Sequence, residues 1–213
     1  MSAPATGLRR FRAPAPPQPE RCELCGTALS GHHRHLVRSE NRSLTCACTP
    51  CALLFEQRGA GQGQYRSVPD RYLADPAHTL DEGAWERLQI PVGTAFFFRN
   101  AELDRLVALY PSPAGATESE LDPASWQAVL GGTPLAALLQ PDVEALLLRR
   151  EQGAAGSSVE CFLVPIDVCY ELVGRMRLTW QGFDGGAEAR AELAAFFDNV
   201  RARARAVRTE EPA

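Results

Sequence analysis

Two pairs of cysteines near the start of the chain have the spacing of metal ligands. In each pair two residues separate the cysteines, as in Cys22-Glu-Leu-Cys25. Such a turn points both thiolates at one place, and two such turns complete the tetrahedral sulfur shell that Zn²⁺ prefers. A shell closed by four protein ligands serves a structural purpose and leaves no position for catalysis. The predicted ligands are Cys22, Cys25, Cys48 and Cys51.

Three other side chains close to these pairs are also able to bind a metal. Cys46 lies two residues before Cys48, and side chains two apart on an extended strand share a face, so Cys46 is able to reach the same ion. By the same rule His33 and His35 point in one direction. Histidines near a metal site are more often outer partners than ligands. Cys46, His33 and His35 are therefore kept as possible substitutes for one of the four cysteines.

The identity of the metal is less determined than its ligands. Two C-x-x-C turns around a single iron ion form the rubredoxin arrangement, and ligand type alone separates zinc from iron poorly. An iron ion or a small iron-sulfur cluster would make the protein an electron carrier, with Cys46 as a further ligand or a resolving thiol. Zinc is the first interpretation, and iron is the alternative.

The composition narrows the classes of function. The chain has 213 residues, of which 45% are hydrophobic, enough for one moderate domain and a small one. All 22 basic residues are arginines, which excludes P-loop, Schiff-base and Ser-Lys chemistry because each needs a lysine. The net charge of −4 argues against a broad nucleic-acid surface. Nucleic-acid binding by a zinc ribbon is therefore kept only as a second alternative.

The chain is expected to be cytoplasmic. No apolar run approaches the ~20 residues needed to cross a bilayer, and the first residues lack the apolar centre of a signal peptide. Five cysteines lie within residues 22–51 and two, Cys161 and Cys169, lie far away, which is unlike the disulfide framework of a secreted protein. We expect the distant pair to be buried and to act as small hydrophobic residues.

Composition shifts divide the chain into four segments. Residues 1–20, rich in alanine, proline and arginine, are expected to be a disordered tail. Residues 21–57 form a zinc-ribbon-like module whose final apolar run, Ala52 to Phe55, is expected to pack against its neighbour. Residues 58–90 form a connector broken by glycine and proline, with a short helix near residues 84–88. Residues 91–208 form an α+β domain.

Two hairpins form the sheet of this predicted domain. Residues 94–99 and 105–110 are apolar runs around a polar turn, and residues 143–148 and 159–164 flank a glycine-rich turn. Together they predict a small antiparallel sheet of about four strands. The sheet is expected to pack against C-terminal helices.

Helix start signals and apolar periods predict four helices. Asp122-Pro123 and Thr133-Pro134 are start signals for two short helices between the hairpins. Two longer helices near the end of the chain carry apolar side chains at steps of three and four, with Asp167 as the N-cap of the first. The predicted helices lie at residues 126–130, 135–139, 169–180 and 193–200.

A polar segment between the hairpins is the best candidate for a functional surface outside the cysteines. Residues 110–122 contain carboxylates, hydroxyls and two prolines, and are interpreted as a loop. Ser112 is not part of a G-x-S-x-G turn, and His78 is the only histidine outside the cysteine-rich segment, so a serine hydrolase is not indicated. Carboxylates before a helix are commonly caps. Capping is therefore preferred to cation binding for Glu118, Glu120 and Asp122, and no catalytic residue is assigned.

Several segments resemble one family of bacterial proteins. They are the ERCELCG turn, the stretch His33-Arg-His35, the CACTPCALLF run, and the IPVGTAFFF, ALYPSPAGATES and LVPIDVCYELVG segments. The family is uncharacterised, is best known from actinobacteria, and is similar from about Leu8 to Arg205. Its genes tend to lie in clusters that encode the actinobacterial-type uptake [NiFe]-hydrogenase.

The resemblance implies a setting and no established activity: hydrogenase biogenesis, metal delivery or electron transfer. Together with the missing catalytic set, it favours a non-enzymatic accessory protein. The metal-clamped module would serve as a docking module, and the α+β domain would bind a protein partner, either a [NiFe]-hydrogenase subunit or a maturation factor. The iron-containing electron carrier stays as the alternative.

Overall fold

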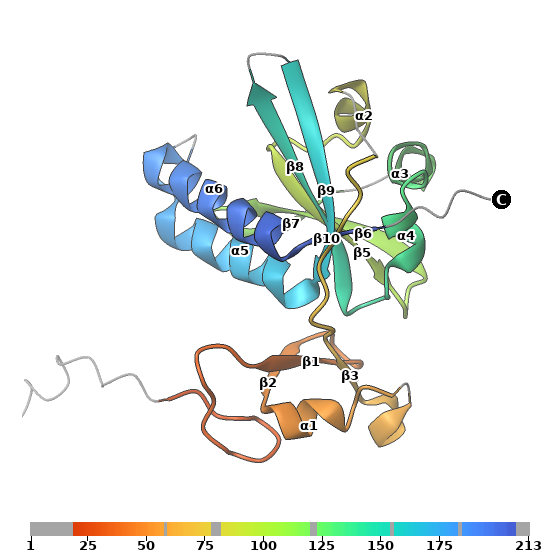
Figure 1. Ribbon diagram of the computed structural model, residues 1–213, viewed down its shortest axis with the longest axis vertical. Coiled ribbons are helices and arrows are strands. Elements are labelled where there is room, and N and C mark those ends of the chain that lie inside the picture. The colour runs from red at the N-terminus through yellow and green to blue at the C-terminus, as the bar shows by residue number, and fades with distance from the viewer. Residues whose placement is uncertain are drawn as a thin grey trace, which may run out of the picture.

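The computed structural model describes residues 19–57, 59–77, 82–119, 123–153, 156–182 and 185–207. Within these ranges it contains a three-stranded sheet, a seven-stranded sheet and six α-helices. The cysteine-rich module lies at one end of the molecule, below the larger sheet in Figure 1. The predicted tail lies outside the described residues over positions 1–18, and so does His78.

The small sheet has the strand order β2-β1-β3. β1 (Arg34–Arg38) pairs antiparallel with β2 (Leu44–Ala47) and with β3 (Tyr65–Ser67). A five-residue helix, α1 (Thr49–Leu53), follows β2 directly, and a 3-10 turn, η2 (Ala60–Gly63), precedes β3. The residues that the sequence assigns to a connector thus contribute a strand to this sheet.

The two faces of the small sheet are buried against different parts of the molecule. Leu36 and Ala47 lie on the face toward the cysteines, whereas Val37 and Leu44 lie in the core of the larger domain. The expectation that Ala52 to Phe55 packs the module against its neighbour is wrong, because Leu53 and Leu54 are 52% and 69% exposed. Val37 and Leu44 make the domain contact instead, because side chains along β1 and β2 alternate between the two faces of the sheet.

The large sheet has the strand order β10-β4-β9-β8-β5-β6-β7. Both predicted hairpins are confirmed, as β5–β6 and β8–β9. The prediction of about four strands is wrong, because β7 extends one edge while β4 and β10 extend the other. All neighbours are antiparallel except β10 and β4. The strands are β4 (Leu73–Ala74), β5 (Thr94–Asn100), β6 (Arg105–Ser112), β7 (Gly115–Ser119), β8 (Glu144–Gly153), β9 (Gly156–Pro165) and β10 (Arg205–Ala206).

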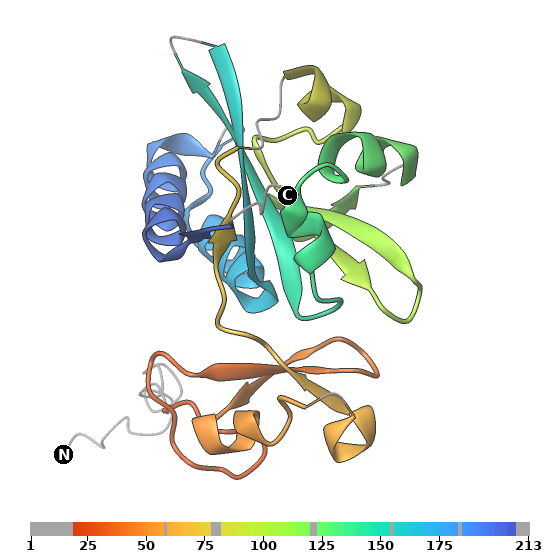
Figure 2. The same cartoon turned by 45° about the vertical axis from the view of Figure 1, so that its right-hand side comes forward.

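Helices cover both faces of the large sheet, which explains its continuous apolar strands. In β5 the consecutive side chains of Phe96, Phe97 and Phe98 alternate between two separate cores. One core lies beneath α5 and α6, and the other beneath α2, α3 and α4, as Figures 1 and 2 show. The helices are α2 (Glu82–Arg87), α3 (Pro123–Leu130), α4 (Pro134–Leu138), α5 (Ile166–Thr179) and α6 (Gly186–Arg203).

The start signals of the helices are only partly used as predicted. Thr133 caps α4, since its side chain accepts a hydrogen bond from the Leu135 N–H. Asp167 is not the N-cap of α5: Pro165 holds that position, and Asp167 lies in the first turn.

In the part of the chain that the structure describes, no helix has both the length and the apolar composition to cross a membrane.

The polar segment after β6 is a strand rather than a loop. Residues 115–119 form β7 and pair with the end of β6, with Tyr110 opposite Thr117. Ser112 is engaged by the turn, because its hydroxyl accepts from Thr117 Oγ1 at 2.9 Å and from the Ala114 N–H at 3.2 Å. Glu118 pairs with Arg105 across the hairpin. The interpretation of this segment as a loop is therefore wrong; Glu120 and Asp122 lie outside the described residues.

Candidate metal centre

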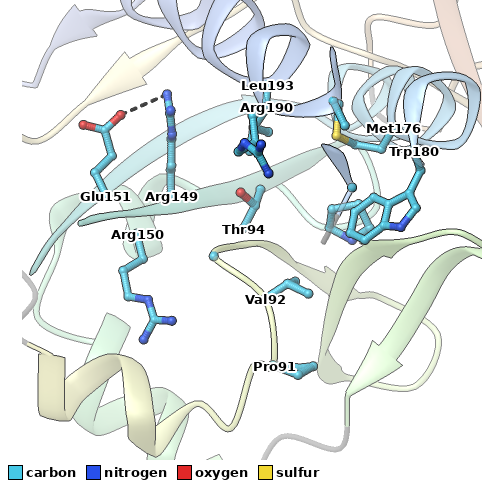
Figure 3. A pocket seen from close by; sticks show the side chains of 14 residues that line it. Pro91, Val92, Thr94, Arg149, Arg150, Glu151, Met176, Trp180, Arg190 and Leu193 are labelled. Atoms are coloured by element: carbon cyan, nitrogen blue, oxygen red, sulfur yellow. Dashed lines mark ion pairs between the residues drawn. The ribbon is translucent and has the colours of Figure 1, made fainter. Parts of the chain in front are cut away.

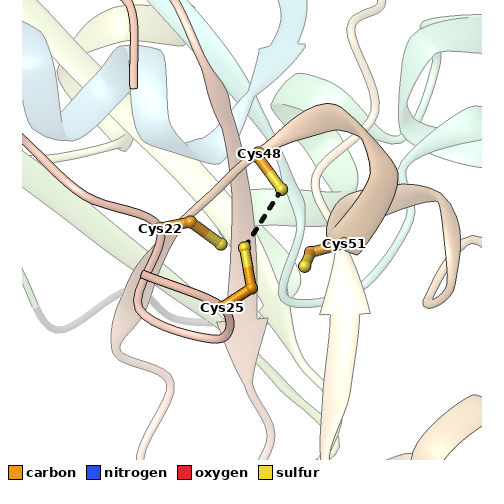
Figure 4. Close-up of side chains that lie close together, drawn as sticks. All are labelled: Cys22, Cys25, Cys48 and Cys51. Atoms are coloured by element: carbon orange, nitrogen blue, oxygen red, sulfur yellow. Dashed lines mark hydrogen bonds between the residues drawn. The ribbon is translucent and has the colours of Figure 1, made fainter. Parts of the chain in front are cut away.

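The four predicted cysteine ligands converge in the small module. Their sulfur atoms all lie within 4.8 Å of one another, and Cys25 Sγ is 3.6 Å from Cys48 Sγ (Figure 4). A tetrahedral ion with Zn–S bonds of about 2.3 Å needs sulfur atoms about 3.8 Å apart. The spacing of the sulfur atoms therefore fits a single four-coordinate ion. The four are Cys22, Cys25, Cys48 and Cys51.

The first pair of cysteines lies on a tight backbone turn. The Gly26 N–H donates to the Cys22 carbonyl at 2.7 Å, and the Cys22 N–H donates to the Thr27 carbonyl at 2.8 Å. Gly26 has a φ of +74°, in the left-handed region that glycine adopts without a steric penalty. The turn buries Cys22 and leaves Cys25 exposed, so it presents one inner and one outer thiol to the same point.

The second pair lies at the start of α1. Cys48 is the N-cap residue and Cys51 lies in the helix, where the Ala52 N–H donates to the Cys48 carbonyl at 2.9 Å. Three residues of a helix make nearly one turn, so both thiols lie on the same side. Pro50 in the first turn lacks an N–H that would have no partner there. The short helix thus points the thiols of the second pair to one side, as the tight turn does for the first pair.

The local environment gives the cysteines different acidities. The Thr27 hydroxyl, 3.3 Å from Cys25 Sγ, is the main cause that lowers the pKa of Cys25 to about 6. Burial alone would raise the pKa of Cys22, but backbone N–H groups of Cys48, Cys25 and Leu24 bring it below the usual value. The hydrogen bond with Cys48 raises the pKa of Cys51 to about 12. The first turn thus favours thiolates, which are the form that binds metal.

The three possible substitutes form a separate group. The ligand atoms of His33, His35 and Cys46 lie within 4.8 Å of one another, apart from the group of four cysteines. β2 ends at Ala47, and Cys48 is the N-cap residue of α1, with its backbone still extended. Cys46 nevertheless lies with the two histidines and Cys48 with the other three cysteines. The rule that side chains two apart share a face does hold for His33 and His35.

A cavity of about 890 Å³ between β8, α5 and α6 was not indicated by the sequence. Figure 3 shows Arg149 paired with Glu151, together with Met176 on α5 and Trp180 directly after that helix. Among the described residues that line the cavity there is no histidine, cysteine or serine. Thr94 brings a hydroxyl to this lining, and no catalytic residue is assigned there.

The two distant cysteines are buried, as predicted. Cys161 and Cys169 are 5% and 0% exposed. Burial raises the pKa of the Cys161 thiol to about 12 and also raises that of Cys169. Both thiols stay protonated near neutral pH, so they pack as small apolar groups and take no part in the metal centre.

The comparison with protein families matches residues 21–204 to one family, described as a family of unknown function (DUF5947). The matched range includes both cysteine pairs and every strand of the two sheets except β10, which begins at Arg205. No curated protein and no solved structure matches the chain.

Proposed function

Since the chain belongs to the DUF5947 family, whose function is unknown, we propose its function from its own residues: a zinc-binding accessory protein that docks on a protein partner. The observation that supports metal binding is the convergence of four cysteine sulfur atoms within 4.8 Å of one another. Four thiolates make a closed shell, as in structural zinc sites of the zinc-ribbon type. The metal then holds the module in shape and takes no part in a reaction.

Iron is the second candidate at the same four cysteines, because four tetrahedral thiolates also suit an iron ion. Metal analysis and a visible spectrum of the full-length protein, purified anaerobically from a native-type host and dialysed against a weak chelator, separate the two. We expect one tightly held zinc per chain and no colour, since Zn²⁺ has a filled d shell. Iron with a thiolate charge-transfer band would replace this proposal with electron transfer. A Cys22→Ser variant should lose the metal.

The proposed partner is a [NiFe]-hydrogenase subunit or a maturation factor. The resemblance to a family encoded beside such hydrogenases supports this partner. The surface of the metal centre supports docking, because Leu24, between the first two cysteines, and Leu53 and Leu54, after the last one, are exposed. Exposed leucines on a rigid module are suited to bury apolar area against another protein.

Co-purification with the hydrogenase subunits and maturation factors tests the partner. Leu53→Ser with Leu54→Ser should weaken capture about tenfold or more, because burying one leucine contributes about 1.5–3 kcal/mol and every 1.4 kcal/mol is tenfold. Leu178→Ser is the matched control, since Leu178 is 89% exposed and lies on α5, away from the module. Zinc content should be equal in all variants. Capture without any hydrogenase component, or equal loss in the control, would contradict the proposal.

A further inference from the structure

A second group of metal-binding side chains lies on the other face of the small sheet. His35 on β1 stands directly opposite Cys46 on β2, and His33 lies two residues before His35, on the same face. The ligand atoms of the three residues lie within 4.8 Å of one another. The two imidazole rings have centroids 4.7 Å apart. The register of β1 and β2 thus brings two imidazoles and one thiol to one place.

Each imidazole uses Nδ1 to contact an oxygen, which sets the state of its other nitrogen. His33 Nδ1 lies 3.1 Å from the Ser30 carbonyl oxygen, and His35 Nδ1 lies 2.7 Å from Oδ2 of Asp167 on α5. A carbonyl or a carboxylate only accepts, so Nδ1 carries the proton, and in the neutral ring Nε2 is then the nitrogen with the lone pair. Metal-binding histidines have this arrangement: one nitrogen donates to an oxygen while the other binds the ion.

The free nitrogen of His33 lacks a partner. Its Nε2 atom is buried and makes no hydrogen bond to any residue within the described ranges. The His33 side chain is only 9% exposed, so bulk water does not solvate this nitrogen. Native proteins rarely leave a buried polar atom without a partner, because the lost hydration is then uncompensated. An ion bound by Nε2 would supply that partner.

We propose that His33, His35 and Cys46 bind a second divalent transition-metal ion, separate from the ion at the four cysteines. Three protein ligands leave one position of a tetrahedral ion open. Both histidines line a cavity of about 470 Å³ between the module and the larger domain, and a small ligand would reach that position from this cavity. The second site is therefore of the open, exchangeable type, in contrast to the closed shell of four thiolates.

The donor atoms define the class of ion. Imidazole nitrogen and thiolate sulfur select late first-row transition metals such as Zn²⁺ and Co²⁺, whereas Mg²⁺ and Ca²⁺ require oxygen ligands. The Cys46 thiolate and the Asp167 carboxylate together balance the two charges of the ion. Asp167 acts as a positioning residue, because it contacts the His35 ring and not the metal.

A Co²⁺ titration of the full-length, reduced, metal-free protein tests the inference. Co²⁺ gives visible d–d bands whose pattern depends on its ligands, so a four-sulfur site and a two-nitrogen, one-sulfur site are distinguishable. The wild-type protein should bind two Co²⁺ per chain. His33→Ala, His35→Ala and Cys46→Ser should each bind one and keep the four-sulfur spectrum. Asp167→Asn should weaken the second Co²⁺ about 10- to 100-fold.

His32→Ala is the matched control, because His32 lines the same cavity but is exposed and outside the group of three ligands. It should bind two Co²⁺ with unchanged affinity. Far-ultraviolet circular dichroism of every variant confirms that the fold is retained. Binding of one Co²⁺ by the wild-type protein would overturn the inference. Retention of the second Co²⁺ in both histidine variants, or loss of the four-sulfur spectrum in Cys46→Ser, would do the same.

Discussion

Removing the metal from the four cysteines should unfold the small module while the seven-stranded sheet stays folded. On the cysteine side of the small sheet the only large aliphatic side chain among the described residues that is fully buried is Leu36; Leu29, Phe55 and Tyr65 pack against this core but are only partly buried. Full burial of a leucine contributes about 1.5–3 kcal/mol. A structural Zn²⁺ contributes about 10–16 kcal/mol of apparent binding free energy. The metal therefore supplies most of the free energy that folds this module.

Hydrogen exchange with and without a strong chelator measures this effect. Amides of β1 and β2 should exchange about a thousandfold faster or more after chelation, since each 1.4 kcal/mol is a factor of ten. Amides of β8 and β9 should keep their protection. Cys51→Ser should behave like the chelated protein, whereas Cys161→Ala, which removes a buried thiol from the large domain, should keep the metal. Unchanged protection of β1 and β2 after complete metal removal would contradict the prediction.

Replacing Glu144 by alanine should destabilise the large domain by about 2–4 kcal/mol. The Glu144 side chain is fully buried at the start of β8. Its carboxylate accepts two hydrogen bonds from Arg71, at 2.8 and 2.6 Å, and one from the Gln140 N–H at 3.0 Å. The substitution would leave the Arg71 guanidinium and a backbone N–H without their acceptor. Unpaired groups of this kind are among the costliest defects in a folded protein.

Chemical denaturation of the zinc-loaded protein measures the change in the free energy of unfolding. Glu144→Gln should recover part of the loss, because its amide oxygen still accepts a hydrogen bond. Glu118→Ala is the matched control: its pair with Arg105 lies on the surface, with both side chains about half exposed, and such a pair contributes about 1 kcal/mol or less. Equal losses in Glu144→Ala and Glu118→Ala would show that burial does not strengthen the Glu144 contacts.

The elements that the sequence predicts correctly are those whose own residues carry a local signal, such as an apolar run, a turn or a helix start. Both long hairpins combine apolar runs with turn residues, and their registers pair Phe96 with Leu109 and Leu148 with Cys161. The Thr133-Pro134 signal coincides with the start of α4. Phe96 to Phe98 lie in a strand that the sequence predicts, but only the C-terminal helices were expected to pack against the sheet. A strand whose residues are continuously apolar is typical of a sheet that is covered on both faces, so this run could have predicted the second layer of helices.

The missed strands have no such signal. β4 and β10 contain two residues each, too few to show a period of two. β7 lies at the edge of the sheet and is polar, because a strand with one neighbour and an exposed side needs no continuous apolar run. Prolines at positions 111 and 113 also favoured a loop. These strands can be identified only from the strands with which they pair in the folded structure, and the local sequence does not reveal those partners.

The two groups of possible metal ligands differ in the same way. The cysteines of each C-x-x-C pair are neighbours in the sequence, so their convergence could be anticipated. The group of His33, His35 and Cys46 depends on the register between two strands and on the residue at which β2 ends. Asp167, which orients His35, is far away in the sequence. From the helical period alone, Asp167 was predicted to be the N-cap of the helix.

The contact between His35 and Asp167 joins residues 132 positions apart, and this separation sets a time order during synthesis. At about 5–20 residues per second, a ribosome needs roughly 7 to 26 seconds to make the intervening chain. During that interval the cysteines and histidines of the nascent module face the metal pool of the cell without α5 beside them. We expect the ion at the four cysteines to be acquired from that pool before α5 is made, so the metal supply during synthesis determines which ion this closed shell carries.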